Sequence, residues 1–138
     1  GIEPSQAADL QLTWGDTGGL KAGADYQYHT QQNSSGVTGY GTALNGDGTP
    51  FFKLTLSTYF GTNGYTFGGY IHITDIGSAS ERPRLNGQFA TLNTVQDLVG
   101  GGFIGVAKSK WTLSQIKLAF SAGNIDLGTM ALYGINKA

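Results

Sequence analysis

Short stretches of alternating apolar and polar residues, separated by glycine-rich segments, extend over most of the chain. Leu10, Leu12 and Trp14 alternate with polar residues, and residues 70–76 and 116–120 show the same period. Successive side chains of a β-strand point to opposite faces of its sheet, so a period of two indicates strands rather than helices. The pattern therefore predicts an all-β, antiparallel protein.

The number and spacing of these stretches narrow the architecture. Roughly eight strands at spacings of about 8 to 15 residues fit into the 138 residues of the chain. They predict a single domain, residues 1–138, built as a two-sheet sandwich with a jelly-roll topology. A closed barrel is the alternative.

Further strands and turns can be assigned from residue type. Strands are predicted at residues 26–32 (as the strand returning from 10–14), 52–57, 65–76 and 85–92, with loops at 15–19, 60–64 and 77–83, while residues 93–98 are ambiguous. Residues 45–50 (Asn-Gly-Asp-Gly-Thr-Pro) predict a turn; a calcium loop is the less favoured alternative because the further carboxylates of an EF-hand are missing. Three consecutive glycines, residues 100–102, are expected to bend a strand or to release one.

The C-terminal stretch predicts a β-hairpin. Ile116, Leu118 and Phe120 alternate before the segment 121–124 (Ser-Ala-Gly-Asn), and alternation resumes at residues 129–135. Asn124 after Gly123 suits a tight turn, because both residue types adopt the left-handed conformation more readily than others.

Composition excludes several classes of function. Only 12% of the residues are charged and the net charge is -1, so no basic field is available to bind nucleic acid or an anionic membrane. The chain contains no cysteine, which excludes a disulfide framework and a thiolate nucleophile. No apolar run approaches the roughly 20 residues that span a bilayer. Met130 is the only methionine, so we expect that Gly1 is not a translation start and that the chain is a fragment of a longer protein rather than a processed one.

No motif for catalysis or cofactor binding is recognisable. His29 and His72 do not have the spacing of a metal-ligand pair, and the nine carboxylates are scattered along the chain. A nucleophile elbow and a phosphate-binding loop are both missing. We therefore expect no enzymatic activity, no cofactor and no metal.

Residues 111–135 (WTLSQIKLAFSAGNIDLGTMALYGI) resemble the C-terminal segment of many tailed-phage tail proteins, with its Ser-x-Gly-Asn turn, Gly-Thr pair and Leu-Tyr-Gly-Ile close. Residues 10–19 and 22–28 and the glycine run 100–102 are similar to the same group. The chain resembles most closely the knob of the tail needle of short-tailed phages. That resemblance implies a homotrimeric jelly roll similar to tumour necrosis factor, forming the C-terminal part of a longer fibrous protein. It also implies that the protein is located in the virion and contacts or penetrates the host cell surface.

Aromatic and charged residues supply candidate ligand sites. Seven aromatic residues lie in or beside predicted loops and strand ends, where a ring can stack on a sugar or, alternatively, belong to the core or its rim: Trp14, Tyr26, Tyr28, Tyr40, Tyr59, Tyr65 and Trp111. The loop with Tyr59, Asn63 and Tyr65 is the first candidate. Glu81, Arg82 and Arg84 form the second, where two guanidinium groups suit a small acidic ligand or acidic sugar between subunits, unless the cluster is a local salt bridge.

Three hypotheses for function follow. The leading one is a non-enzymatic, homotrimeric head of a phage tail needle or fibre that contacts the host surface. The alternatives are a monomeric carbohydrate-binding module of a secreted protein and a virion decoration protein without a ligand.

Overall fold

A computed structural model describes residues 2–6, 8–36, 42–55, 66–78, 80–92 and 97–134, without the side chains of residues 42, 126 and 127. Every regular element in this part of the chain is a β-strand, and all strand pairs are antiparallel. The strands are β1 (Ile2–Pro4), β2 (Leu10–Asp16), β3 (Gly19–Leu20), β4 (Tyr26–Ser34), β5 (Thr42–Thr49), β6 (Phe52–Lys53), β7 (Gly68–Thr74), β8 (Arg84–Leu92), β9 (Leu98–Ala107), β10 (Gln115–Phe120) and β11 (Ile125–Gly128).

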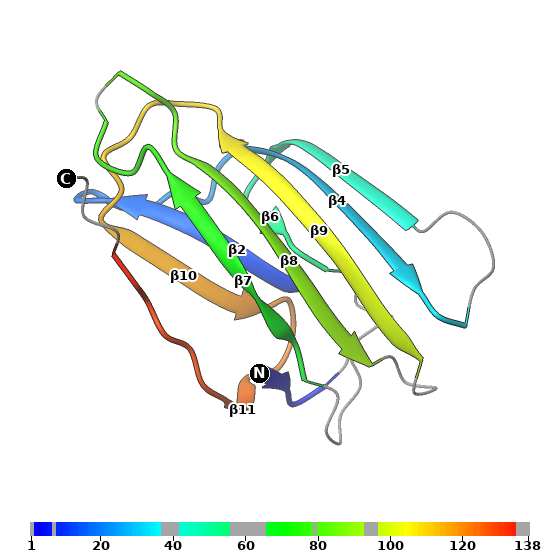
Figure 1. Cartoon of the computed structure of the whole chain (residues 1–138). Helices are drawn as coiled ribbons and strands as arrows, with labels where there is room; N and C mark the ends of the chain where they lie inside the picture. The colour runs from blue at the N-terminus through cyan, green and yellow to red at the C-terminus, as the bar shows by residue number, and fades with distance from the viewer. Residues whose placement is uncertain are drawn as a thin grey trace.

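The strands form two sheets and a short ribbon (Figure 1). The larger sheet has five strands in the order β5-β4-β9-β8-β7, and the smaller has four, with β10, β3 and β6 all paired to β2. Strands β1 and β11 pair separately at one end. The prediction of an all-β protein with antiparallel sheets is confirmed, and the arrangement is consistent with a β-sandwich.

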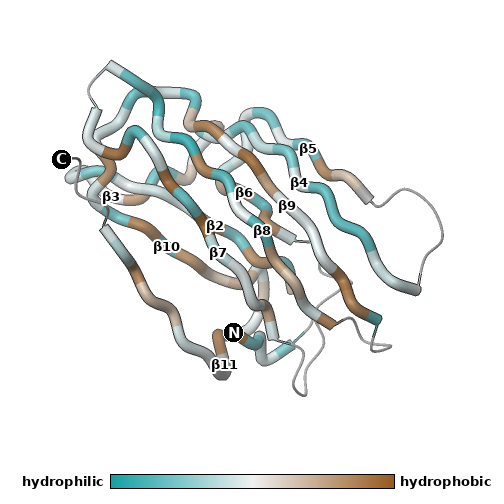
Figure 2. Tube along the Cα trace, viewed as in Figure 1, coloured by the Kyte–Doolittle hydropathy of each residue, from teal (hydrophilic) through white to brown (hydrophobic). Residues whose placement is uncertain are grey.

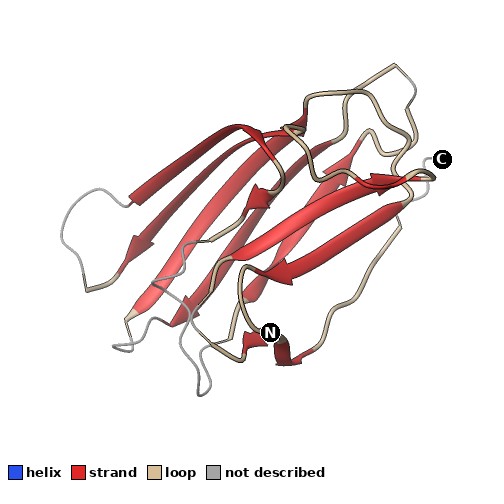
Figure 3. Cartoon of the chain, turned by 180° about the vertical axis from the view of Figure 1, so that it is seen from behind, coloured by secondary structure: helices blue, strands red, loops and turns tan. Residues whose placement is uncertain are grey.

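The core lies between the two sheets. Seen from behind, β10 and β2 lie in front of the five-stranded sheet (Figure 3), and apolar residues recur along β2, β10, β8 and β9 (Figure 2). Residues from both sheets join in one buried cluster: Ile2, Ala8, Leu10, Leu12, Trp14, Tyr26, Phe52, Leu54, Phe67, Leu85, Phe89, Val99, Phe103, Ala107 and Phe120. The strand predicted at residues 65–76 is confirmed over 68–74 as β7, and the one predicted at 85–92 is confirmed as β8. Residues 75 and 76 lie beyond the end of β7, and residue 65 lies outside the described part of the chain. β8 packs its alternate residues into this core.

Three aromatic rings make up the centre of the core. The centroid of Phe52 lies 4.6 Å from those of Trp14 and Tyr26, and all three side chains are fully buried. The Tyr26 hydroxyl accepts a hydrogen bond from the Trp14 backbone N–H at 2.9 Å and donates to the Lys21 carbonyl at 2.6 Å. Burial raises the pKa of this phenol to about 12. Trp14 and Tyr26 therefore belong to the core, which was the alternative to stacking on a ligand. Stacking on a ligand is wrong for these two residues, because both rings are fully buried.

The glycine run does not bend or release a strand, and that expectation is wrong. Residues 100–102 lie within β9, which continues to Ala107 and pairs along its length with β4 and β8. Gly101 is opposite Phe89 in the ladder, and a Cβ on Gly101 would come within 2.8 Å of that ring. The glycine therefore leaves room for an aromatic ring on the core side of the sheet.

The strand predicted at residues 26–32 is confirmed as β4, but its expected partner is wrong. β4 pairs with β5 and β9 in the five-stranded sheet, whereas β2 pairs with β3, β6 and β10 in the other. The chain thus passes from the four-stranded sheet to the five-stranded sheet before β4, and β4 does not form a hairpin with β2. Tyr26 connects the two layers through its hydrogen bond to the Trp14 backbone.

The turn predicted at residues 45–50 is also wrong, because most of this segment is strand β5. Gly48, with φ of 66°, is an extra residue between the partners of Tyr26 and Gln27, so the glycine-rich segment forms a bulge. Lys108 Nζ donates to Asp47 Oδ1 at 2.9 Å and lowers the pKa of that carboxyl. The Asp47 carboxylate is thus paired with the ammonium group of Lys108 of the same chain.

Of the predicted strand 52–57, the structure describes residues 52–55, and among these only β6 is regular strand. Phe52, Leu54 and Thr55 are all buried, and Thr55 Oγ1 accepts a hydrogen bond from the Leu10 N–H at 2.9 Å. Residues 56 and 57 lie outside the described part of the chain.

The predicted C-terminal hairpin is not formed. β10 pairs with β2, and β11 pairs with β1 through Ile2 opposite Gly128. The Ser5 N–H donates a hydrogen bond to the Asn124 carbonyl oxygen, and the Ser5 Oγ accepts one from the Asn124 N–H. The turn is therefore attached to the N-terminal segment. Residues 129–134 have no regular secondary structure, and the Leu132 and Tyr133 side chains are 86% and 85% exposed.

Candidate functional site

The five-stranded sheet has one face on the core and one face toward solvent. Along β8, exposed and buried residues alternate from Arg84 to Leu92 without exception. We call the solvent side of this sheet the outer face. Because β4, β9, β8 and β7 pair without a register shift, residues from distant parts of the sequence line up across these four strands in rows.

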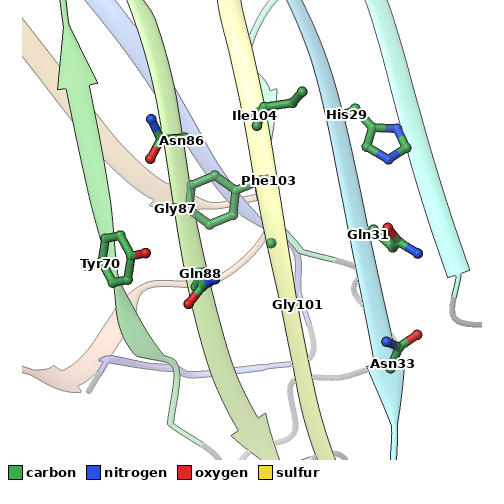
Figure 4. Close-up of a pocket in the computed structure, with 11 residues that line it drawn as sticks. His29, Gln31, Asn33, Tyr70, Asn86, Gly87, Gln88, Gly101, Phe103 and Ile104 are labelled. Carbon is green, nitrogen blue, oxygen red and sulfur yellow. The ribbon is translucent and has the colours of Figure 1, made fainter.

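The central row crosses four strands at the level of Gly102. The register aligns Gln31 of β4, Gly102 of β9, Gln88 of β8 and Tyr70 of β7. Gly102 has no side chain, so the row is low in its middle and bounded by the two glutamine side chains (Figure 4). The Tyr70 side chain is 57% exposed at the end of the row.

The neighbouring rows differ in height. On one side, the exposed Ile104 lies between His29 and Asn86. On the other side, Gly100 lies between Asn33 and Ala90, so the surface stays low there. Rows on one face of a strand are about 7 Å apart.

Together these rows form two adjoining hollows of about 460 and 580 Å³. Both are lined by Asn33, Gln88 and Gly101, so they are continuous along β9, and we call them together the trough. The first is further lined by His29, Gln31, Tyr70, Asn86, Gly87, Gly102, Phe103 and Ile104, and the second by Ser34, Ser35, Phe89, Leu98 and Gly100.

The polar groups along the trough are available to a ligand. Within the described part of the chain, the side chains of Gln31, Asn33, Asn86 and Gln88 form no hydrogen bond, and neither does the Tyr70 hydroxyl. Each amide offers donors and an acceptor side by side. This combination suits a ligand with many hydroxyl groups.

His29 is held in place by a neighbour on β5. Its Nδ1 lies within hydrogen-bond distance of Asn45 Oδ1. Asn45 Oδ1 can only accept, so Nδ1 donates and, in the neutral ring, Nε2 is left as an acceptor. The imidazole thus presents a defined hydrogen-bonding group beside the trough.

The trough has no formally charged side chain when His29 is neutral. No Asp, Glu, Lys or Arg side chain is among its described lining residues. The lining therefore offers no carboxylate pair for acid and base chemistry and no guanidinium clamp for an anion. Its geometry favours binding a neutral, polar molecule.

The structure tests the sequence-predicted site only in part. Tyr59, Asn63 and Tyr65 lie outside the described residues. Arg84 Nε lies 3.6 Å from Asp75 Oδ2 and one of its terminal nitrogens 3.6 Å from Glu81 Oε2, so Glu81 and Arg84 form part of a local ion-pair cluster. Arg82 is exposed and forms no ion pair with any described residue. None of the three lines the trough.

Sequence reasoning missed the residues of the trough. A partial signal was present, because polar residues occupy every second position from Gln27 to Asn33 and again at Asn86 and Gln88. That pattern gives a polar strand face. It does not give the register that brings Gln31, Gln88 and Tyr70 into one row.

Comparison with known proteins finds no matching family model, no similar curated protein and no similar solved structure. Within the described residues, no helix is long and apolar enough to cross a membrane. The same residues contain no cluster of three or more His, Asp or Glu side chains that could bind a metal ion.

Proposed function

We propose that this protein is a non-enzymatic recognition domain that binds a neutral carbohydrate in the trough on its outer face. The row of Gln31, Gly102, Gln88 and Tyr70 is the observation that supports this most directly. The two amides can donate to and accept from sugar hydroxyls, while the exposed tyrosine ring can stack on the apolar face of a pyranose. The neutral lining favours uncharged sugars over acidic ones.

The wider setting that we propose is the head of a phage tail needle or fibre, assembled as a homotrimer and directed at the host cell surface. The support is the resemblance of residues 10–19, 22–28 and 111–135 to tail proteins, together with the all-β fold. The finer assignment, a jelly roll similar to tumour necrosis factor, belongs to the same proposal. Cell-surface polysaccharide is the ligand that such a head would meet first.

A carbohydrate-binding module of a secreted protein is the second candidate, and the same trough supports it. The two candidates differ in assembly, because the module would be monomeric. A ligand-free decoration protein is the third, and it predicts no sugar binding at all.

The experiment is a calorimetric titration with neutral and acidic oligosaccharides. We expect binding of a neutral sugar, weakened about tenfold by Tyr70→Ala because an aromatic contact is worth on the order of 1 kcal/mol. His72→Ala is the matched control, since His72 is exposed on the same strand but does not line the trough.

Two results would oppose the proposal. Failure of every neutral sugar to bind would contradict it. Binding of acidic sugars alone, lost on Arg82→Ala or Arg84→Ala, would support the charged cluster as the ligand site instead.

A further inference from the structure

The two glycines on the floor of the trough are not required by the fold. A Cβ on Gly102 would lie 3.4 Å from the nearest heavy atom, the Gly87 carbonyl oxygen, and a Cβ on Gly100 would lie 3.7 Å from the Phe89 carbonyl oxygen. These are ordinary contact distances. Neither glycine has a positive φ, so an alanine could adopt the same backbone conformation.

The glycines of β9 that point to the core are different. A Cβ on Gly101 would come 2.3 Å from the Gln31 carbonyl oxygen, and one on Gly105 would come 2.4 Å from the Phe52 ring. Packing therefore explains Gly101 and Gly105. It does not explain Gly100 and Gly102.

A glycine inside a strand lowers stability relative to alanine, because its backbone loses more conformational freedom on folding. Two glycines at successive positions on one face of a strand therefore lower the stability of the fold. Such a loss is expected where the open space above them serves a function. Glycine within a strand also marks sites where another molecule approaches the backbone closely. A ligand that lies on the strand itself would account for the open space above Gly100 and Gly102.

The trough has the shape of a channel rather than a single socket. Its two hollows adjoin along β9, where they share Gly101 as a lining residue, and the exposed side chains of Ile104 and Leu98 line the first and the second hollow. These residues are six positions apart, which corresponds to about 20 Å of strand. Free amides border the channel on both sides, from Gln31 and Asn33 on β4 and from Asn86 and Gln88 on β8.

From these observations, and resting on the proposed function, we infer that the ligand is a linear, unbranched, neutral polysaccharide that lies lengthwise along β9. Successive sugar rings occupy the floor above Gly102 and Gly100. The amides of β4 and β8 bond hydroxyl groups on the two edges of the chain. The ring above Gly102 contacts Tyr70, and the chain extends from there toward Leu98.

The test uses ladders of linear neutral oligosaccharides, from disaccharide to hexasaccharide, made of glucose, mannose, galactose or N-acetylglucosamine. For the ladder that binds, affinity is expected to rise with length until the channel is filled. Gly102→Val should weaken every length at least tenfold. Gly100→Val should leave the disaccharide unchanged and remove the gain in affinity of the longer chains.

Gly77→Val is the matched control, because a Cβ there meets nothing within 4 Å and the residue lies in the loop before β8. Thermal unfolding of each variant checks the fold, and Gly100→Ala and Gly102→Ala replace the valines if either variant unfolds.

The outcomes separate this inference from the proposed function. Loss of binding in Gly102→Val, with affinity independent of length and insensitive to Gly100→Val, would overturn the lengthwise mode and leave sugar binding in place. Wild-type affinity in both variants, or no binding of any ladder, would overturn both.

Discussion

At the scale of single residues, the buried Tyr26 side chain joins the two layers of the core. Tyr26 lies at the start of β4 and reaches across to the opposite sheet, where its hydroxyl satisfies the N–H of Trp14 and the carbonyl of Lys21. An unpaired backbone group in that position would have no water to bond. The phenol is therefore an interlayer connection as well as an apolar ring.

Tyr26→Phe tests this connection. The variant keeps the ring but removes the partner of the buried Trp14 N–H and of the part-buried Lys21 carbonyl, so the free energy of unfolding should fall by about 1–3 kcal/mol. Urea denaturation monitored by tryptophan fluorescence measures the change. Tyr28→Phe is the control, because its half-buried hydroxyl forms no hydrogen bond with any described residue. Equal stability of the two variants would contradict the assigned role.

At the scale of elements, β9 combines two kinds of glycine on its two faces. On the core face, Gly101 is paired with Phe89, and Phe103 is paired with Gly87 of β8, so each ring lies against a residue without a side chain. On the outer face, Gly100 and Gly102 form the floor of the trough. One strand thus serves both packing and the proposed recognition.

Alanine substitutions should distinguish the two faces. Gly101→Ala places a methyl group against the Gln31 carbonyl and the Phe89 ring, and should cost about 1–3 kcal/mol of stability. Gly100→Ala meets only ordinary contacts and should be neutral or stabilising by up to about 1 kcal/mol. Chemical denaturation of the pair gives the answer. A destabilised Gly100→Ala would show that the fold itself requires that glycine.

At the scale of the whole molecule, local pattern predicted more than long-range pairing did. Period-two alternation was sufficient to predict β8 and the two antiparallel sheets. The partners of β4 and β11 could not be predicted, because they depend on contacts such as Tyr26 with Trp14 and Ser5 with Asn124, which join distant segments. The trough was missed for the same reason, because its central row brings together residues as distant in the sequence as Gln31 and Gly102.

Assembly also belongs to this scale. β10 is the outermost strand of the smaller sheet, and its Ile116 side chain is 43% exposed. The apolar segment 129–134 runs along the outer side of β10 without a backbone hydrogen bond to any described residue (Figures 1 and 3). An open edge and an exposed apolar segment are features that a subunit contact would cover.

Light scattering after size exclusion tests the proposed homotrimer. We expect a mass three times the 14.5 kDa of one chain, and dissociation when Leu132 and Tyr133 are both replaced by lysine. Ile76→Lys is the control, because it changes an exposed apolar residue outside this segment and should leave the assembly intact. A monomer at every concentration would contradict assembly through this segment and favour the carbohydrate-binding module.

The most direct measurement of the central claim is an NMR titration of the isotope-labelled protein with the neutral oligosaccharide that binds best. The account predicts that chemical shifts change at the backbone amides of Gly100 and Gly102 and at the side-chain amides of Gln31 and Gln88, and that Lys21 and Lys117 in the opposite sheet region do not respond. Shift changes confined to Arg82 and its neighbours, or to residues 129–134, would contradict recognition on the outer face of the five-stranded sheet.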